Sequence, residues 1–175
     1  LHTATMSTKS TLEGKILIAM PNLLDPNFYR TVVLIVEHDD EGALGLVLNR
    51  VSALTTQELC INQGVIWRGR NEQVRVGGPV QPTSLWILHR MEREGEDSTP
   101  ISKDCYLTTS LEGLGDVAEA EGEGRRIFAG YSGWGDAQLD DEVREGIWLV
   151  ADPDGTLIFE AGAGSLWEEA LRKVG

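Results

Sequence analysis

The sequence predicts an α/β (α+β) fold: a mixed β-sheet with packed helices and a small inserted α+β subdomain. Short apolar runs rich in β-branched residues alternate with turn sequences, and several polar stretches open with helix-capping residues. The 175 residues suffice for one core but are few for two ordinary domains. We therefore expect a flexible N-terminal tail over 1–10 and a single domain over 11–175, with 81–125 as the inserted subdomain.

Three apolar runs near the N-terminus predict strands. Lys15–Met20 ends at a proline, and Val32–Val36 is rich in β-branched residues, so both are expected to be buried. The segment 21–27 between them contains prolines, asparagines and an aspartate, which favour a fixed, irregular loop. Ala43–Leu48 is the third run. The sequence 40–42 before it predicts a hairpin turn, with glycine at its positive φ.

The middle of the chain predicts one helix and two strands. Thr55 and Glu58 have the spacing of a capping box, so a helix of one or two turns is expected to begin there. Gln73–Val76 and Leu85–His89 are expected to be strands around the bend Gly77-Gly78-Pro79.

Polar residues 91–99 show no apolar rhythm and predict an exposed, mobile loop. Thr109 and Glu112 form a second capping box before an amphipathic helix. A strand over 126–131 is expected to follow this helix.

The C-terminal part predicts two helices and a second hairpin. Asp136 is expected to cap a helix whose charges match the helix dipole. Ile147–Val150 and Thr156–Phe159 flank Asp152-Pro153-Asp154-Gly155, which favours a turn between two strands. Ser165 is expected to cap the last helix.

The composition narrows the classes of function. The chain has 28 acidic and 15 basic residues and a net charge of −13, which disfavours nucleic acid as a partner. No apolar run approaches the ~20 residues that span a bilayer, and no secretory signal is expected at the start. Cys60 and Cys105 form no CxxC pair, which is typical of a cytoplasmic protein with small buried thiols rather than reactive ones.

Longer motifs extend along the chain. They are Leu17-Ile18-Ala19-Met20-Pro21, Asp25-x-x-Phe28-x-Arg30, Glu37-His38-x-x-Glu41-Gly42-Ala43-x-Gly45-Leu46-Val47-Leu48-Asn49-Arg50, Gly77-Gly78-Pro79-Val80, Gly130-Tyr131-Ser132-Gly133-Trp134-Gly135-x-x-Gln138-Leu139-x-x-Glu142 and Leu166-Trp167-x-x-Ala170-Leu171. Through these motifs the chain resembles the bacterial YqgE/AlgH family over nearly its whole length from Leu12. It departs at Val51, where the family usually has proline.

The resemblance implies a compact α/β fold with a mixed sheet and a smaller α+β insertion. It also implies a link with regulation of gene expression, including alginate production in some members. The family pattern carries over no catalytic residue, so we assign none. We also expect no metal and no cofactor.

Individual motifs give only weak indications of catalysis. The segment 130–134 resembles a nucleophile elbow but has Trp134 where glycine is required, so we expect a tight turn with the indole beside it. Gly113-x-Gly115-x-x-Ala118 resembles a dinucleotide fingerprint but lies within a predicted helix. His38 and the acidic residues 39–41 are expected to form a solvated turn, with a cation site as the alternative. His89 is expected to be structural.

The polar residues of the motifs form our candidate ligand- or partner-binding set. They are Asp25, Asn27, Arg30, Asn49, Arg50, Tyr131, Trp134 and Gln138. Each is expected at a strand end or in a turn, where ligand clefts of α/β sheets usually open. The alternative is architectural: Asp25 and Arg30 form a salt bridge, while Asn49 and Gln138 satisfy backbone groups.

Two classes of function remain open. The first is a non-catalytic binding or regulatory module that acts through a protein partner or small ligand at the Gly133-Trp134 turn and the 25–30 loop. The second is a hydrolase or transferase that uses carboxylates such as Asp25 and Asp136, with or without a metal. The sequence favours the first and leaves the ligand and the oligomeric state open.

Overall fold

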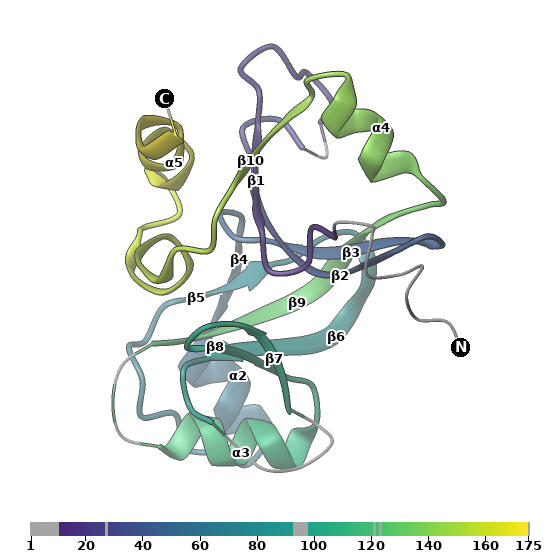
Figure 1. The fold of residues 1–175 in the computed structure, drawn as a ribbon. Coiled ribbons are helices and arrows are strands. Elements are labelled where there is room, and N and C mark those ends of the chain that lie inside the picture. Colours follow the sequence, from purple (N-terminus) through teal and green to yellow (C-terminus); the bar gives the residue numbers. More distant parts are fainter. Residues whose placement is uncertain (1–10, 27, 93–97, 121, 123, 175) are drawn as a thin grey trace, which may run out of the picture.

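The protein is built on one strongly curled, mixed β-sheet (Figure 1). The computed structural model describes every residue except 1–10, 27, 93–97, 121, 123 and 175. The main path of the sheet runs β10-β1-β2-β3-β9-β6-β8-β7, and every pairing on it is antiparallel. Strand β4 pairs with β5, and β5 pairs in parallel with β9, so the sheet is mixed as predicted.

The ten strands cover a large part of the described chain. Their bounds are β1 Ile16–Ala19, β2 Val32–Asp39, β3 Gly42–Val47, β4 Val51–Thr55, β5 Gln73–Val76, β6 Val80–His89, β7 Ser98–Ser102, β8 Cys105–Thr108, β9 Arg125–Trp134 and β10 Trp148–Ala151. The helical elements are α2 Thr56–Asn62, α3 Leu111–Glu119, α4 Gln138–Arg144, the π-helical turn η1 Thr156–Glu160 and α5 Leu166–Val174.

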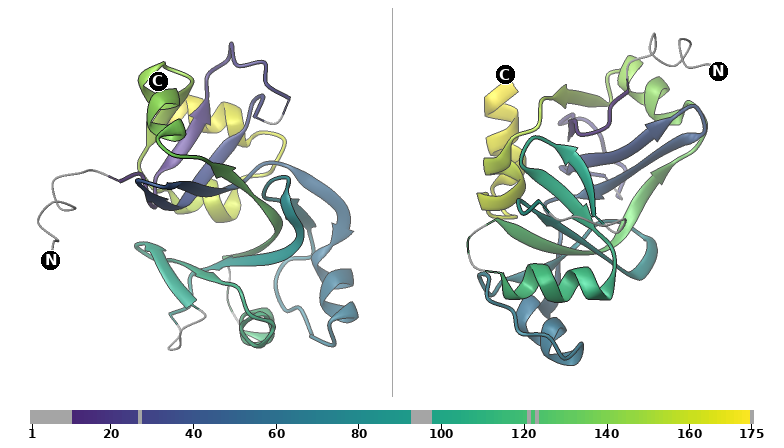
Figure 2. Two further views of the ribbon diagram at one scale, coloured as in Figure 1. Left: turned by 90° about the vertical axis from the view of Figure 1, so that its right-hand side faces the viewer. Right: turned by 60° about the horizontal axis from the view of Figure 1, so that its bottom comes forward.

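Helices cover both faces of the curled sheet and create three apolar clusters (Figures 1 and 2). Inside the curl, β1, β2, β3 and β9 pack against η1 and α5. On the outer face of β1, β2 and β3, α4 packs over a second cluster. A third cluster lies under α2 and α3, against β5, β6 and β9. Helical elements therefore cover parts of both faces of the sheet.

Two glycines after β5, Gly77 and Gly78, lie in close contact with the backbones of β3 and β9. Gly77 donates its amide hydrogen bond to Ala129 and accepts one from Val47, and so joins β9 to β3. A Cβ atom at Gly77 would lie 2.4 Å from the carbonyl oxygen of Gly130, and one at Gly78 would lie 2.2 Å from the backbone of Tyr131. The Gly77-Gly78 pair therefore allows two backbones to approach more closely than any other residues would permit.

Most predicted elements are present, and the hairpin at residues 40–42 is confirmed, with Asp39 paired to Gly42 at φ 142°. The capping box at Thr55 is also confirmed, with both reciprocal hydrogen bonds formed. Both cysteines are buried, as expected. Strands β4, β7 and β8 were not predicted, and β7 begins at Ser98, inside the expected loop 91–99.

Two predicted helix caps were wrong by one residue. Helix α3 is capped by Ser110 rather than Thr109, because the Ser110 hydroxyl accepts the hydrogen bond from the Gly113 amide. Helix α4 follows Ala137, which adopts the left-handed conformation at φ 58°, and not Asp136. Here the Gln138 side chain accepts the hydrogen bond from the Gly135 amide and fixes the entry to the helix.

The predicted second hairpin was wrong as well. Residues 156–160 form the π-helical turn η1 instead of a strand, because Asp154 Oδ1 accepts hydrogen bonds from the amides of Thr156 and Leu157. The side chains of Leu157, Ile158 and Phe159 are all buried in this turn.

The expected tight turn at 130–134 was also wrong, because these residues continue β9 to Trp134. The predicted tail 1–10, Asn27 and the centre of the 91–99 loop lie outside the described residues. Segment 81–125 supplies β6, β7, β8 and α3 to the shared sheet, and its separation as a subdomain stays a prediction.

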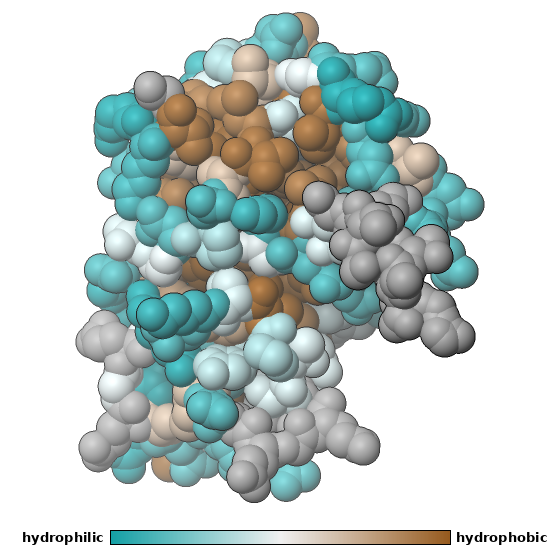
Figure 3. Space-filling model, viewed as in Figure 1, coloured by the Kyte–Doolittle hydropathy of each residue, from teal (hydrophilic) through white to brown (hydrophobic). Residues whose placement is uncertain are grey.

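The surface view shows apolar atoms gathered between α4 and α5, over β10 and β1 (Figure 3). The side chain of Val150 on β10 is 38% exposed in this region. Within the described residues, no helix combines the length and apolarity needed to cross a membrane.

Candidate functional site

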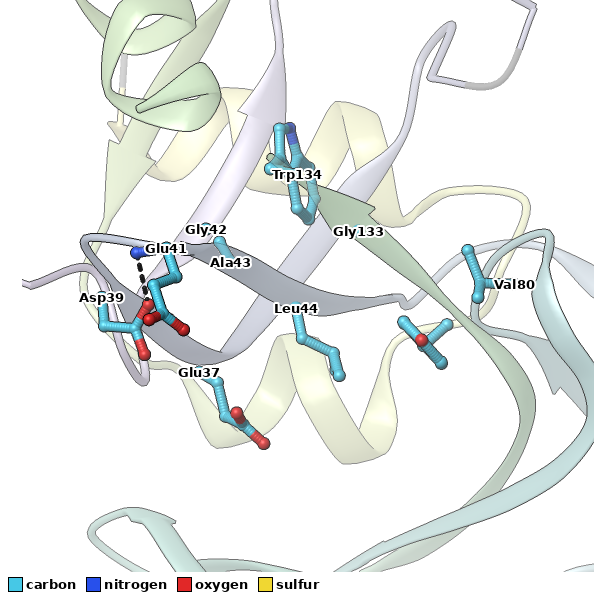
Figure 4. Close-up of a pocket in the computed structure, with 10 residues that line it drawn as sticks. Glu37, Asp39, Glu41, Gly42, Ala43, Leu44, Val80, Gly133 and Trp134 are labelled. Carbon is cyan, nitrogen blue, oxygen red and sulfur yellow. Dashed lines mark hydrogen bonds between the residues drawn. The ribbon is translucent and has the colours of Figure 1, made fainter. Parts of the chain in front are cut away.

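A groove of about 490 Å³ lies beside the β2–β3 hairpin and forms the best candidate site. Its walls come from β2 and β3, from the start of β6 and from the end of β9 (Figure 4). We call it the acidic groove, defined by Glu37, Asp39, Glu41, Gly42, Ala43, Leu44, Val80, Tyr131, Gly133 and Trp134.

A β-bulge in β2 directs two carboxylates into this groove. Ile35 pairs with Gly45 but Glu37 pairs with Leu44, so Val36 is the extra residue of the bulge. The extra residue shifts the alternation of side chains by one position. Glu37 and Asp39 consequently line the groove, while His38 points to the opposite face and contacts Asp140 on α4.

The three carboxylates of the groove are exposed and carry no counter-charge among the described residues. Asp39 Oδ1 accepts a hydrogen bond of 2.8 Å from the Glu41 amide, which fixes the turn (Figure 4). In the part of the chain that the structure describes, no ion pair involves Glu37, Asp39 or Glu41. The groove therefore has a negatively charged rim.

The rest of the groove is apolar and open. Leu44 and Val80 line it together with Tyr131, whose ring packs edge-on against Trp86 at a centroid distance of 5.6 Å. At Gly133 an added Cβ would meet only Tyr131, at 3.8 Å, so glycine leaves this part of the groove unfilled. The groove thus combines an acidic rim with an apolar lining.

Of the predicted site residues that the structure describes, Tyr131 and Trp134 alone line the acidic groove. Trp134 is 5% exposed, and its ring lies stacked on Phe28 at 5.5 Å. Its indole N–H donates to Glu142 Oε1 at 3.0 Å, and Trp148 donates to the same oxygen at 2.9 Å. The side chain of Trp134 is thus part of the core.

Gln138 belongs to the same architectural cluster. Its carbonyl oxygen accepts from the Gly135 amide at 2.9 Å, and its amide donates to Glu142 Oε2 at 3.1 Å. The glutamate therefore receives hydrogen bonds from two indoles and one side-chain amide. Glu142 was not singled out in the predicted site, although it closes the same motif.

Asn49 and Arg50 hold the loop that precedes β2. Asn49 accepts a hydrogen bond from the Val32 amide at 3.0 Å and donates to the Arg30 carbonyl at 2.9 Å. Arg50 donates to the Pro26 carbonyl at 3.0 Å. Burial lowers the pKa of Arg50, and the charge of Asp25 opposes this effect.

The Arg30 side chain packs on aromatic rings. Its guanidinium carbon lies 4.9 Å from the Trp167 ring centroid and 5.4 Å from that of Tyr29. Arg30 itself adopts the left-handed conformation at φ 53°, which Asn49 helps to hold through the Arg30 carbonyl. Asn49 and Gln138 thus make the backbone contacts expected in the architectural alternative, and Arg50 makes a further one.

Ser132, His89 and the two cysteines, which were weighed for reactivity, occupy buried positions. Ser132 is 1% exposed and donates to the Gly77 carbonyl. His89 is buried and shares a hydrogen bond of 2.7 Å with Thr108. Burial raises the pKa of Cys60, and it raises that of Cys105 to about 12 against smaller effects of Ser102 and Arg90. Across the described ranges, no three His, Cys, Asp or Glu side chains are grouped as metal ligands.

Sequence reasoning missed the carboxylates of the groove. The spacing of Glu37 and Asp39 was a usable signal, because residues two apart share one face of a strand, and Glu41 follows them in the hairpin turn. The bulge at Val36 and the approach of β9 were not readable from spacing, since both depend on long-range pairing.

These features define an α+β domain with a curled sheet, motif residues that hold loops and helices, and one acidic groove. The AlgH-like family model (DUF179) matches residues 16–175, and the chain belongs to this family. A UPF0301 protein of Paracoccus denitrificans is 40% identical over 97% of this chain and 93% of the relative. A UPF0301 protein of Myxococcus xanthus is 38% identical over 91% of this chain and 89% of the relative.

Solved structures agree with the fold. The AlgH protein from Pseudomonas aeruginosa superposes with a TM-score of 0.77 at 31% identity, covering 95% of this chain and 90% of that one. A crystal structure from Corynebacterium diphtheriae gives a TM-score of 0.74 at 20% identity, covering 94% and 87%, and supports the fold alone. The predicted family and fold class are therefore confirmed.

Proposed function

We propose that the protein is a non-catalytic binding module whose acidic groove holds an extended, cationic segment of a partner protein. One observation carries the proposal: three exposed carboxylates without a cationic partner among the described residues border an apolar lining. Lysine or arginine side chains would pair with the rim, and apolar side chains between them would contact Leu44, Val80 and Tyr131.

The arrangement of the carboxylates favours a segment over a single ion. Glu37, Asp39 and Glu41 follow one another along a hairpin and do not form a ligand cluster in the described structure. Charges spaced along an extended chain match this arrangement better than one point charge. Through such an interaction the protein would act as a regulatory module in the cytoplasm. The control of gene expression that the family resemblance implies is one process it would regulate.

Isothermal titration calorimetry with a blocked hexapeptide of alternating lysine and leucine tests the proposal. We expect saturable binding that weakens with salt, and none with a peptide that has glutamate in place of lysine. The triple variant Glu37→Gln, Asp39→Asn, Glu41→Gln removes the rim charges and should lower the affinity at least tenfold.

Two further variants separate groove binding from attraction to an acidic protein. Glu112→Gln, Glu119→Gln, Glu168→Gln removes the same charge from α3 and α5, where the three glutamates are exposed, and should keep the affinity within twofold. Gly133→Val fills the groove without a charge change and should abolish binding. Equal loss in both triple variants, or normal binding by Gly133→Val, contradicts the proposal.

A further inference from the structure

Arg90 occupies a slot between two glycines on another part of the molecule. An added Cβ at Gly124 would lie 2.7 Å from Arg90 Cδ, and one at Gly155 would lie 2.7 Å from Arg90 Nη2. The guanidinium carbon lies 4.9 Å from the ring centroid of Phe159. Glycine at both positions therefore makes room for this side chain, and an aromatic ring supports it.

Within the described structure, the N–H groups of the Arg90 guanidinium have few acceptors. Its nearest described carboxylate oxygen belongs to Glu160, at 3.7 Å, beyond hydrogen-bond distance. Arg126, by contrast, donates to Glu72 and to the Ile158 carbonyl. The Arg90 side chain is 39% exposed, so its donors are reachable from solvent while the stem is packed.

This side chain lines a cavity of about 430 Å³, which we call the Arg90 pocket. The turn between β7 and β8 supplies Ser102, Lys103 and Asp104, and the opposite wall is formed by Pro153 and Phe159. The volume lies within the range of small-molecule sites. The Arg90 pocket shares no lining residue with the acidic groove.

We propose that the Arg90 pocket binds a small organic anion. Arg90 holds its carboxylate or phosphate group through paired N–H donors, and Lys103 of the β7–β8 turn adds a second positive charge beside the negative charge of Asp104. The apolar part of the ligand lies against Pro153 and Phe159. This site is independent of the partner proposed for the acidic groove.

Calorimetry and amide NMR shifts with benzoate, phenyl phosphate and inorganic phosphate test the site. We expect saturable binding of benzoate or phenyl phosphate, tighter than that of inorganic phosphate because the ring adds contacts with the apolar wall. The tighter of the two aromatic probes distinguishes a carboxylate ligand from a phosphate ligand. Shifted amides should include those of Gly155 and the 102–105 turn.

Three variants distinguish binding in the slot around Arg90 from general attraction of an anion to positive charge. Arg90→Gln should lower the affinity at least tenfold. Gly155→Ala keeps every charge but pushes the guanidinium aside, and its φ of −62° suits alanine, so we expect a folded protein with at least fivefold weaker binding. Arg172→Gln removes an exposed positive charge from α5 and should change the affinity less than twofold.

Three results would overturn the proposal. The first is no saturable heat with any probe at 10 mM. The second is equal weakening by Arg172→Gln and Arg90→Gln, and the third is unchanged binding by Gly155→Ala. Circular dichroism of each variant confirms that a lost affinity does not reflect unfolding.

Discussion

The carboxylates near the two faces of β9 at its end differ in whether they have side-chain partners. On the outer face, Trp134 is buried and its indole is bound by Glu142, which also binds Trp148 and Gln138. On the groove face, Gly133 is open, and the carboxylates across from it have no cation among the described residues. The comparison teaches that a polar motif residue can serve the architecture of the fold, and that the proposed site lies where side-chain partners are missing among the described residues.

The largest expected effect is the loss of the carboxylate that binds both indoles. Glu142→Ala leaves the indole N–H groups of Trp134 and Trp148 without their acceptor, so we expect the free energy of unfolding to fall by about 2–4 kcal/mol. Glu142→Gln retains an acceptor oxygen and should cost less than half as much. Denaturant unfolding followed by tryptophan fluorescence measures both. A loss below about 1 kcal/mol for the alanine variant would refute the architectural role.

A smaller loss is expected at Asn49, which joins the loop before β2 to the end of β3. Asn49→Ala removes hydrogen bonds to the Val32 amide and the Arg30 carbonyl and should lower the free energy of unfolding by about 1–2 kcal/mol. Asn49→Asp keeps the acceptor for Val32 and should lie between wild type and alanine. If alanine and wild type have the same denaturation midpoint, Asn49 is available for a ligand rather than for the loop.

The sequence predicted those parts of the fold that depend on local chemistry. The hairpin at Gly42 and the capping box at Thr55 rest on residues within four positions of each other, and both are present. Strand β4 was missed because its partner β5 follows only after helix α2, and β7 was missed because its residues are mostly polar. Residues 156–159 were read as a strand because apolar runs of that length do not distinguish a strand from a buried helical turn.

The candidate site was less predictable than the fold. Motif membership identified Asn49, Arg50 and Gln138, but a motif alone does not tell which polar atoms already have backbone partners. Of the three groove carboxylates, Asp39 and Glu41 were read as part of a solvated turn, and Glu37 was not singled out. Only the bulge at Val36 and the approach of Tyr131 make them one wall of a groove.

Asp154 is intermediate between Glu142 and the groove carboxylates, because it is partly exposed but has several partners. Partial burial acts to raise its pKa, but hydrogen bonds from Lys173 and from the Leu157 and Thr156 amides together lower it. A lowered folded-state pKa contributes stability above the unfolded value of about 3.9 and loses it as pH falls through the folded pKa.

Replacing this group should therefore flatten the acid limb of the stability curve. We expect Asp154→Asn to lower the free energy of unfolding at pH 7 by under about 1 kcal/mol and to lose that difference near pH 2. Urea unfolding between pH 2 and pH 7 measures the effect. A difference that is constant with pH would show that the hydrogen-bonding geometry matters and the charge does not.

The smallest effect on stability is expected in the acidic groove, where it sharpens the contrast with Glu142. The triple variant Glu37→Gln, Asp39→Asn, Glu41→Gln keeps the Asp39 acceptor atom for the Glu41 amide and removes mutual repulsion between like charges. Its free energy of unfolding should stay within about 0.5 kcal/mol of wild type in the same denaturant titration. Replacing carboxylates on the two faces of the sheet would then lower the free energy of unfolding by amounts that differ several-fold. The groove carboxylates would therefore contribute little to folding and be available for binding. A loss of 2 kcal/mol or more would place them with Glu142 as part of the architecture, and the groove would then have no claim to be the site.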